Sequence, residues 1–229
     1  MSKKKLAVFD IDGTIFRSSL LIELVEEMIA RGIFPPRTRR QYLREKNDWQ
    51  NRVGGYEEYI MGVVRVFGKN IKGVKWGEFK KASEAVLRSN KNKVYKYTRD
   101  LVRDLKKKNY YLLAISHSPK YIVHDFALAL GFDKVYGRIL ELDGNNRFTG
   151  EVLYEDLIMD KAKIMERVIE KEGLTLRGSV GVGDTESDIA FLKMVDRPIC
   201  FNPNSLLYRA GRKSAWQVVV ERKDVIYEL

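Results

Sequence analysis

The stretch that decides the fold is LAVFDIDGT, residues 6–14. Its apolar first half ends at Asp10, which predicts a buried β-strand with an acid at its carboxyl end. Residues two apart on a strand point to the same side, so Asp10 and Asp12 can both project toward one ligand. A carboxylate is ionised at neutral pH and can act as a nucleophile without a base, while a second carboxyl can protonate a leaving alcohol. Gly13 lets the chain turn and brings backbone N–H groups near an anion.

The same letters also resemble the start of a calcium-binding loop, D-x-D-G. Such a loop needs glycine at its sixth position and glutamate at its twelfth. Counted from Asp10, these positions hold Ile15 and Leu21. The calcium-loop interpretation therefore fails, and the buried strand that leads into the acids also argues against it.

Strands and helices alternate along the rest of the core. Further strands are predicted at 110–115, 179–182 and, as the last of the core, 198–201; helices are predicted at 94–108, from Ser118-Pro119 to Gly131, at 160–172 and from about Thr185. The letters DGNN, residues 143–146, separate two short strand-like runs and predict a hairpin turn. This alternation predicts an α/β fold with a doubly wound parallel sheet, in which ligands lie at the carboxyl ends of the strands.

The segment after the first strand has a different pattern. Up to residue 92 it predicts helices and no strands, with breaks at Gly54-Gly55, Gly68 and Gly73. We therefore expect a mainly α-helical cap at 18–92, inserted after the first strand into an α/β core of residues 1–17 and 93–229.

The net charge of +11 is unevenly distributed. Residues 31–108 contain 22 Lys/Arg and 8 Asp/Glu, so the positive charge is concentrated in the predicted cap and the helix that follows it. One interpretation is a set of solvated helix faces. The other is a positive field that attracts an anionic substrate or nucleic acid.

The cysteine content and the hydropathy suggest where the protein resides. Cys200 is the single cysteine, so no intrachain disulfide can form, and its apolar surroundings predict a buried, inert thiol. The apolar run after Lys3–Lys5 is broken at Asp10 and is too short for a signal peptide. No stretch approaches the ~20 apolar residues of a membrane span. We expect a soluble cytoplasmic protein without a membrane span.

Two further acids follow a predicted strand in GVGDTESD, residues 181–188. Mg²⁺ is typically held by one or two carboxylates together with phosphate oxygens, and Asp10 with Asp184 would meet that need. Asp188 has two interpretations. It is either a third acid of the site or the last residue of a T-x-x-D capping box that begins at Thr185.

Other polar residues can reach a phosphate at the same edge of the sheet. Ser116 ends the second predicted strand and offers a hydroxyl group. Lys161 opens a helix just after Asp160, where a cation opposes the helix dipole by about 0.3–1 kcal/mol. Such a lysine either binds phosphate or is an ordinary exposed residue. His117 lies near the predicted site, although no mechanism so far requires it.

Taken in order, four pieces resemble the haloacid dehalogenase superfamily of phosphotransferases. They are DIDGT, Ser116 in LLAISHSP, Lys161 in DKAKIMERVIEKEGL, and GVGDTESDIAFL. The resemblance covers roughly residues 5–17 and 93–220. RFTGEV (147–152) and FNPNSLL (201–207) resemble the phosphoserine-phosphatase-like branch, whose helical cap is inserted after the first strand.

The resemblance implies a Mg²⁺-dependent phosphatase that forms an aspartyl-phosphate. Asp10 is then the nucleophile, Asp12 the general acid/base and Lys161 a cation that holds the phosphoryl group. Asp12 decides the class of reaction, because dehalogenases of this superfamily lack that second aspartate. Closure of the cap would exclude water and select the leaving group.

The remaining candidates bind the metal or the substrate. The implied Mg²⁺ ligands are Asp10, Asp12 through its backbone carbonyl, Asp184 and Asp188. The expected substrate-binding residues are Gly13, Thr14, Arg17, Ser116 and His117.

One segment departs from the phosphoserine phosphatases. These enzymes carry a glutamate shortly after the first motif that reads the amino group of the substrate, whereas FRSSL, residues 16–20, contains no acid. Arg17 and the basic cap suit a small phosphorylated substrate with negative charge beyond its phosphate. Two alternatives stay open: a phosphomutase or phosphotransferase on the same core, and a nucleic-acid-binding protein that uses the basic insert.

Overall fold

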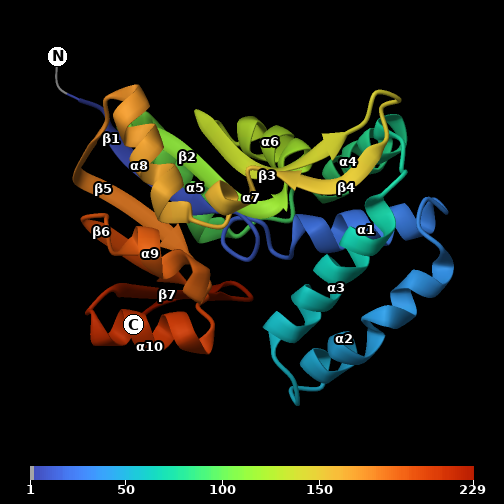
Figure 1. Ribbon diagram of the computed structural model, residues 1–229. Coiled ribbons are helices and arrows are strands. Elements are labelled where there is room, and N and C mark those ends of the chain that lie inside the picture. The colour runs from blue at the N-terminus through green and yellow to red at the C-terminus, as the bar shows by residue number, and fades with distance from the viewer. Residues whose placement is uncertain (1–2) are drawn as a thin grey trace. The chain divides into compact units, whose positions relative to one another are not determined.

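The structure is a computed structural model that describes residues 3–229. Its strands form a sheet with the order β4-β3-β2-β1-β5-β6-β7-β8 (Figure 1). The strands are β1 (Lys5–Asp10), β2 (Tyr111–Pro119), β3 (Lys134–Leu142), β4 (Phe148–Leu153), β5 (Thr175–Gly183), β6 (Arg197–Phe201), β7 (Gln217–Arg222) and β8 (Val225–Glu228). The six inner strands, β3-β2-β1-β5-β6-β7, pair in parallel. The two outer strands are antiparallel to their neighbours, β4 to β3 and β8 to β7. The predicted α/β fold with a parallel sheet is therefore confirmed.

Helices cover the sheet of the core and bury its central strand. Leu6 and Val8 of β1 point into a cluster formed with α8 (Lys161–Glu172), α9 (Ile189–Leu192) and α10 (Ser205–Lys213). Phe9 points to the opposite face, where its ring packs edge-on against Phe132 with the centroids 5.6 Å apart. A parallel strand covered on both faces is continuously apolar, which explains the run from Leu6 to Phe9.

The remaining helices fall into two groups. In the core they are α5 (Lys96–Lys107), α6 (Lys120–Ala129), α7 (Glu155–Ile158) and the short η2 (Glu186–Asp188). In the segment after β1 they are α1 (Leu20–Ala30), η1 (Pro36–Gln41), α2 (Leu43–Gln50), α3 (Tyr56–Ile71) and α4 (Trp76–Asn90). No strand forms between residues 18 and 92, as the pattern predicts for this stretch.

The chain divides into two compact units, which differ from the expected ranges at residue 92 and at the hairpin 139–153. One unit comprises residues 1–17, 92–138 and 154–229, and the other comprises 18–91 together with 139–153. The expected core range of 93–229 thus wrongly included the hairpin 139–153. Phe148 of β4 explains the difference, because its ring packs edge-on against Phe79 of α4 and its backbone bonds to Gly73 and Val74.

Gly68 does not break a helix, contrary to the prediction. It lies inside α3, whose buried face includes Val63, Val66 and Phe67. Packing of such a face outweighs the cost of about 1 kcal/mol that a glycine brings to a helix interior.

The boundary predicted at Ser118-Pro119 is also wrong. Strand β2 continues through Pro119, which pairs with Arg138 of β3, and α6 begins at Lys120. The backbone N–H of Ser118 donates to the hydroxyl of Ser116. This hydrogen bond lies within the end of the strand, and Ser118 is not a helix N-cap.

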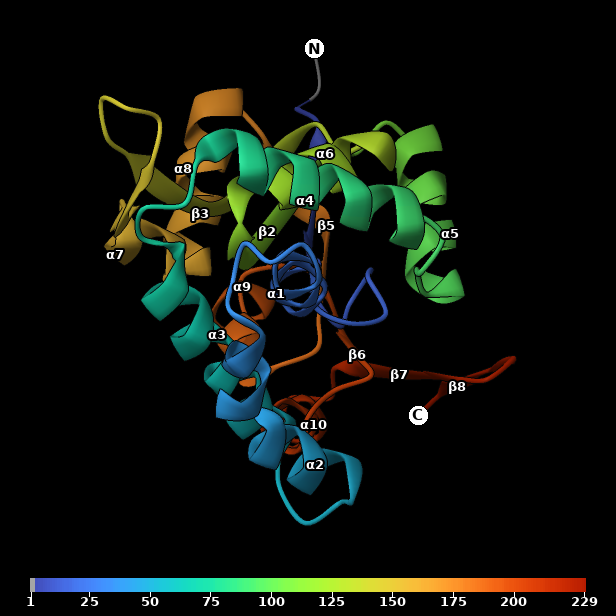
Figure 2. The ribbon, with the colours of Figure 1, turned by 90° about the vertical axis from the view of Figure 1, so that its right-hand side faces the viewer.

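The last core strand was predicted at 198–201, whereas the structure adds two more strands, β7 and β8, at this edge of the sheet (Figure 2).

The single cysteine, Cys200, lies in the core of the protein. The thiol is free and buried in β6, and burial raises its pKa to about 11. Such a thiol is a poor nucleophile at neutral pH, as expected.

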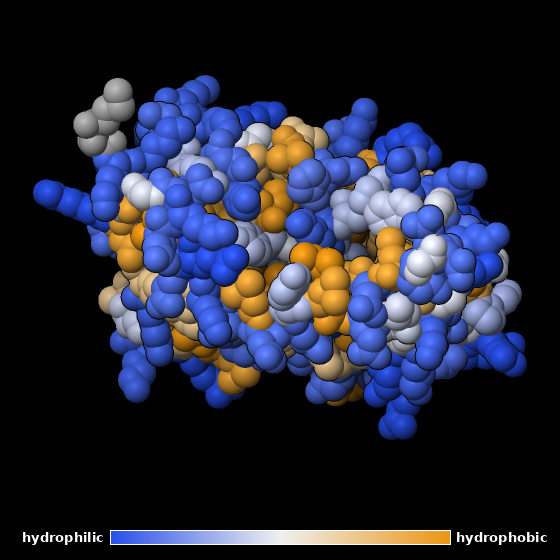
Figure 3. All heavy atoms as spheres, turned by 45° about the horizontal axis from the view of Figure 1, so that its top comes forward, coloured by the Kyte–Doolittle hydropathy of each residue, from blue (hydrophilic) through white to orange (hydrophobic). Residues whose placement is uncertain are grey.

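Among residues 3–229, no helix has the length and apolar character that a membrane span requires. Figure 3 shows a face on which hydrophilic residues predominate and hydrophobic residues form groups between them.

Candidate active site

The first strand delivers Asp10 to the carboxyl edge of the sheet. Asp10 is the last residue of β1 and its exposed fraction is only 5%. The chain then turns at Gly13, where φ is +84° and an added Cβ would collide with the carboxylate of Asp184. Glycine is therefore required there both for the backbone conformation and for the close approach of Asp184.

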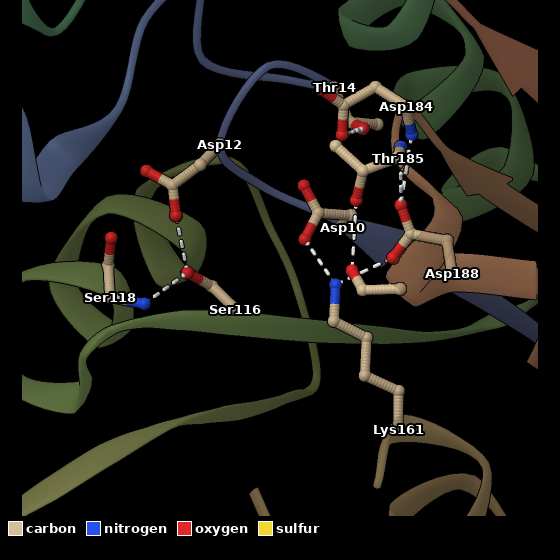
Figure 4. A network of polar contacts seen from close by, with 10 residues as sticks. Asp10, Asp12, Thr14, Ser116, Ser118, Lys161, Asp184, Thr185 and Asp188 are labelled. Atoms are coloured by element: carbon tan, nitrogen blue, oxygen red, sulfur yellow. Dashed lines mark hydrogen bonds and ion pairs between the residues drawn. The ribbon is translucent and has the colours of Figure 1, made fainter. Parts of the chain in front are cut away.

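Lys161 lies between two acids. Its ammonium donates to Oδ1 of Asp10 at 2.7 Å and to Oδ1 of Asp188 at 2.6 Å (Figure 4). Lys161 is 3% exposed and opens α8, whose N-cap Asp160 accepts from the N–H of Lys163. The two carboxylates outweigh the unfavourable helix dipole, so the interpretation as an ordinary exposed lysine is wrong.

Asp188 combines both of its predicted interpretations. One carboxylate oxygen accepts from Lys161, and the other accepts from the backbone N–H of Asp184 at 3.0 Å and of Thr185 at 3.1 Å. The capping box that begins at Thr185 is present. A cap of this kind fixes the rotamer of Asp188 and thereby aims its other oxygen at the lysine.

Asp184 follows β5 directly and completes a group of acids. Oxygen atoms of Asp10, Asp184 and Asp188 all lie within 4.8 Å of one another. The hydroxyl of Thr14 donates to Asp184 at 3.2 Å, and the hydroxyl of Thr98 holds the carbonyl of Thr14 at 2.9 Å. Sequence reasoning missed Thr98, because one threonine within a charged helix gives no signal of this contact.

The second acid of the DIDGT motif turns to a different partner. The hydroxyl of Ser116 donates to Oδ2 of Asp12 at 2.5 Å, and Ser116 in turn accepts from the N–H of Ser118 at 2.9 Å (Figure 4). The side chain of Asp12 is thus not part of the three-acid group. Its expected metal contact through the backbone carbonyl stays a prediction.

Arg17 and His117 lie outside this hydrogen-bonded network. Arg17 is exposed, and its backbone N–H donates to the carbonyl of Lys93. His117 follows Ser116 directly, and burial lowers the pKa of its imidazole to about 4, so the ring is neutral at pH 7. His117 lies near enough to Lys161 and Asp188 for their charges to affect its pKa. Substrate binding by Arg17 or His117 stays a prediction.

The electrostatics of the group are dominated by burial and by the surplus of acids. Burial raises the pKa of Asp10 to about 8, against the attraction of Lys161, and the neighbouring carboxylates raise it further. Burial likewise raises the pKa of Asp184 well above its usual range. Burial alone would lower the pKa of Lys161, but Asp10 and Asp188 raise it, so the lysine stays protonated. When all three acids are ionised, one ammonium faces three carboxylates, and this surplus of negative charge leaves room for a cation.

The donor set fits a divalent metal ion. Oδ2 of Asp10 is buried and has no hydrogen-bond partner among residues 3–229. A buried carboxylate oxygen without a donor is costly, and a metal ion would satisfy it. Mg²⁺ prefers oxygen ligands and takes one or two carboxylates with phosphate oxygens, which Asp10 and Asp184 can provide.

We expect the stability of the metal-free protein to fall as the pH rises from about 5 to 8. The pKa of Asp10 is about 8 in the folded state against 3.8 for an ordinary aspartate, so the folded state holds a proton that the unfolded chain has lost. One such proton lowers the free energy of unfolding by up to about 1.4 kcal/mol per pH unit, whereas Lys161 titrates above this window. Urea unfolding in EDTA would measure the slope, and Asp10→Asn should reduce it. An equal slope in both proteins would contradict the assignment.

Comparison with known proteins identifies the family to which the chain belongs. Residues 7–193 match the family described as haloacid dehalogenase-like hydrolase. The chain is 27% identical over 208 residues to a phosphoserine phosphatase of Archaeoglobus fulgidus, which covers 90% of this chain and 54% of that protein. It is 24% identical over 226 residues to a phosphoserine phosphatase of Methanocaldococcus jannaschii, which covers 97% of this chain and 95% of that protein.

A solved structure gives the same fold. The structure described as a phospho-aspartyl intermediate analogue of phosphoserine phosphatase superposes with a TM-score of 0.65 at 21% identity, covering 97% of this chain and 96% of that one. The chain therefore belongs to the haloacid dehalogenase-like hydrolases, and its resemblance to the phosphoserine-phosphatase-like branch is confirmed. It spans about half the length of the Archaeoglobus relative and nearly the whole of the Methanocaldococcus one.

Proposed function

We propose that the protein is a Mg²⁺-dependent phosphomonoester hydrolase that acts through an aspartyl-phosphate on Asp10. The observation that carries this proposal is the buried ammonium of Lys161 between Asp10 and Asp188. Beside it lies the second oxygen of Asp10, which has no hydrogen-bond partner in the described part of the chain. Family membership supports it. A carboxylate with one oxygen held by lysine and the other free of donors is arranged to attack an electrophile.

In the first step Oδ2 of Asp10 attacks phosphorus in line with the ester oxygen. The Asp10–phosphorus bond forms as the bond from phosphorus to the ester oxygen breaks, and Asp12 gives a proton to the departing alcohol. Lys161 and the hydroxyl of Ser116 bind the equatorial oxygens, where charge is spread in the transition state.

In the second step water releases the phosphate. Asp12, now a carboxylate, takes a proton from a water molecule whose oxygen attacks phosphorus, and the bond to Asp10 breaks. Asp10 returns to its carboxylate form and inorganic phosphate leaves. Mg²⁺, held by Asp10, Asp184 and the backbone carbonyl of Asp12, with Asp188 in support, would neutralise part of the phosphoryl charge.

The direct test is a panel of phosphomonoesters with Mg²⁺ or with EDTA. Phosphate release that requires Mg²⁺ supports the proposal, and its absence from every ester contradicts it. The phosphomutase or phosphotransferase alternative predicts transfer to an added alcohol instead of incorporation of oxygen from ¹⁸O-labelled water. The family and the intact acids favour hydrolysis over the nucleic-acid-binding alternative, which predicts salt-sensitive RNA or DNA affinity without Mg²⁺-dependent activity.

Asp12→Asn should lower turnover by about 10²–10⁴, which is the usual contribution of general acid–base catalysis. With p-nitrophenyl phosphate the first step needs little protonation, because nitrophenolate is a good leaving group, while the second step still needs a base. We therefore expect a rapid burst of nitrophenolate that approaches the enzyme concentration, followed by slow release of phosphate. Stopped-flow absorbance measures the burst, and unchanged steady-state turnover would remove Asp12 from this role.

The substrate is proposed to be small and anionic beyond its phosphate. Two relatives are phosphoserine phosphatases, so phosphoserine belongs in the panel. Residues 16–20 offer no acid for an ammonium group, and Arg17 would repel one. A clear preference for phosphoserine over other anionic phosphomonoesters would refute this part of the proposal.

A further inference from the structure

The middle of β3 lies directly beside the segment that follows Ser116. Arg138 pairs with Pro119 of β2, and Gly137 is buried. A Cβ on Gly137 would lie 2.7 Å from the Cα of Lys120 and 3.0 Å from the carbonyl oxygen of Ser118. Such close backbone contact requires glycine, and it places the next residue, Arg138, beside Pro119, the last residue of β2.

Among residues 3–229, the guanidinium of Arg138 has no acidic partner. Its Nη2 donates to the thioether sulfur of Met159 at 3.3 Å, and Met159 stands two residues before Lys161. Its Nε is buried and has no hydrogen-bond partner within the described chain, residues 3–229. A thioether is a weak acceptor, so this half-buried cation keeps most of its capacity to bind an oxyanion.

His117 offers a second partnerless atom close by. Its Nε2 is buried and has no hydrogen-bond partner in the part of the chain that the structure describes, while the carbonyl of Ile158 accepts a hydrogen bond from the ring. Arg138 and Lys161 are near enough to lower the pKa of this imidazole, after burial itself. Because the ring is neutral and its other nitrogen donates to Ile158, Nε2 is an acceptor, and a hydroxyl group of the substrate can donate to it.

We propose that Arg138 and His117 form a subsite for the leaving group of the substrate. Arg138 binds an oxyanion on the alcohol, either a carboxylate or a second phosphate, and His117 binds a neighbouring hydroxyl. The subsite rests on the proposed phosphatase function and specifies its substrate class as phosphorylated hydroxy acids or polyol bisphosphates. Both residues position the substrate and take no part in the transfer of the phosphoryl group.

The test compares four esters in wild type and in Arg138→Met. The esters are 3-phosphoglycerate, fructose 1,6-bisphosphate, glycerol 3-phosphate and p-nitrophenyl phosphate, which carry respectively a carboxylate with a hydroxyl, a second phosphate with hydroxyls, hydroxyls alone, and neither group. We expect the kcat/KM of at least one oxyanion-bearing ester, divided by that of p-nitrophenyl phosphate, to fall about 10- to 100-fold in Arg138→Met. Which of the two oxyanion esters loses more identifies the source of the oxyanion.

Matched variants separate recognition from folding. Arg138→Lys should recover part of the ratio, and His117→Phe should lower the ratio for glycerol 3-phosphate. Arg177→Met is the control, because this exposed arginine lies in the N-terminal half of β5, away from the carboxyl edge. A wild-type protein that hydrolyses p-nitrophenyl phosphate but whose ratios are unchanged in Arg138→Met overturns the subsite alone. Wild type without Mg²⁺-dependent hydrolysis of any ester overturns the proposed function, and the subsite with it.

Discussion

Asp10→Asn should lower the turnover of phosphomonoesters by about three to six orders of magnitude, as loss of a nucleophile does in other covalent enzymes. An amide nitrogen or oxygen cannot replace the carboxylate oxygen that is proposed to attack phosphorus. The substitution keeps the shape of the side chain, and its amide oxygen can still accept from Lys161. Steady-state phosphate release with Mg²⁺ measures the loss.

Two controls make the result specific to the nucleophile. Asp104→Asn changes an exposed aspartate of α5 and should leave turnover unchanged. Circular dichroism should show that Asp10→Asn is folded, since Lys161 keeps its bond to Asp188. Acid quenching after mixing with ³²P-labelled substrate should trap label on wild type but not on Asp10→Asn. Activity that survives the substitution would remove Asp10 from its proposed role.

The core fold could be predicted from sequence because its signals are local. The apolar run before Asp10 is continuous because β1 is covered on both faces, and the core strands β2, β5 and β6 each follow a helix. The hairpin turn at residues 143–146 was likewise visible in its letters, and it joins β3 to β4.

What failed depends on contacts between distant residues. The assignment of the hairpin 139–153 to the helical unit depends on the packing of Phe148 against Phe79. A contact between two aromatic residues so far apart in sequence cannot be predicted from local patterns. The strand end at Pro119 depends on its pairing with Arg138. Strong local signals, here serine followed by proline, yield to such pairing.

The site divides in the same way. The two acids of DIDGT were predicted as site residues because they lie two apart where an apolar strand ends. Lys161 and Asp188, in contrast, each had an ordinary structural interpretation. Only the fold shows that Asp188 caps its helix with one oxygen and binds Lys161 with the other. Arg138 was not predicted as a site residue, because its proposed role rests on a buried Nε without a hydrogen-bond partner in the described chain, which only the structure shows.

Lys161→Met should destabilise the metal-free protein by about 3–5 kcal/mol at pH 8, because it leaves buried carboxylates without their cation. Lys163→Met, an exposed lysine two residues further along α8, is the matched control and should change stability by less than about 0.5 kcal/mol. Urea unfolding in EDTA measures both variants.

The loss in Lys161→Met should depend on pH in a defined direction. Without the ammonium, the already raised pKa of Asp10 rises further, so the folded state binds protons that the unfolded chain has released, and stability falls with increasing pH. At pH 5 those protons neutralise the surplus charge, and the difference from wild type should shrink. Saturating Mg²⁺ at pH 8 should restore about 2–3 kcal/mol if it binds only the folded protein at about 100 times its dissociation constant. Equal stability of Lys161→Met and Lys163→Met at pH 8 would contradict this prediction. Lys161 would then not offset the negative charge of the three buried acids.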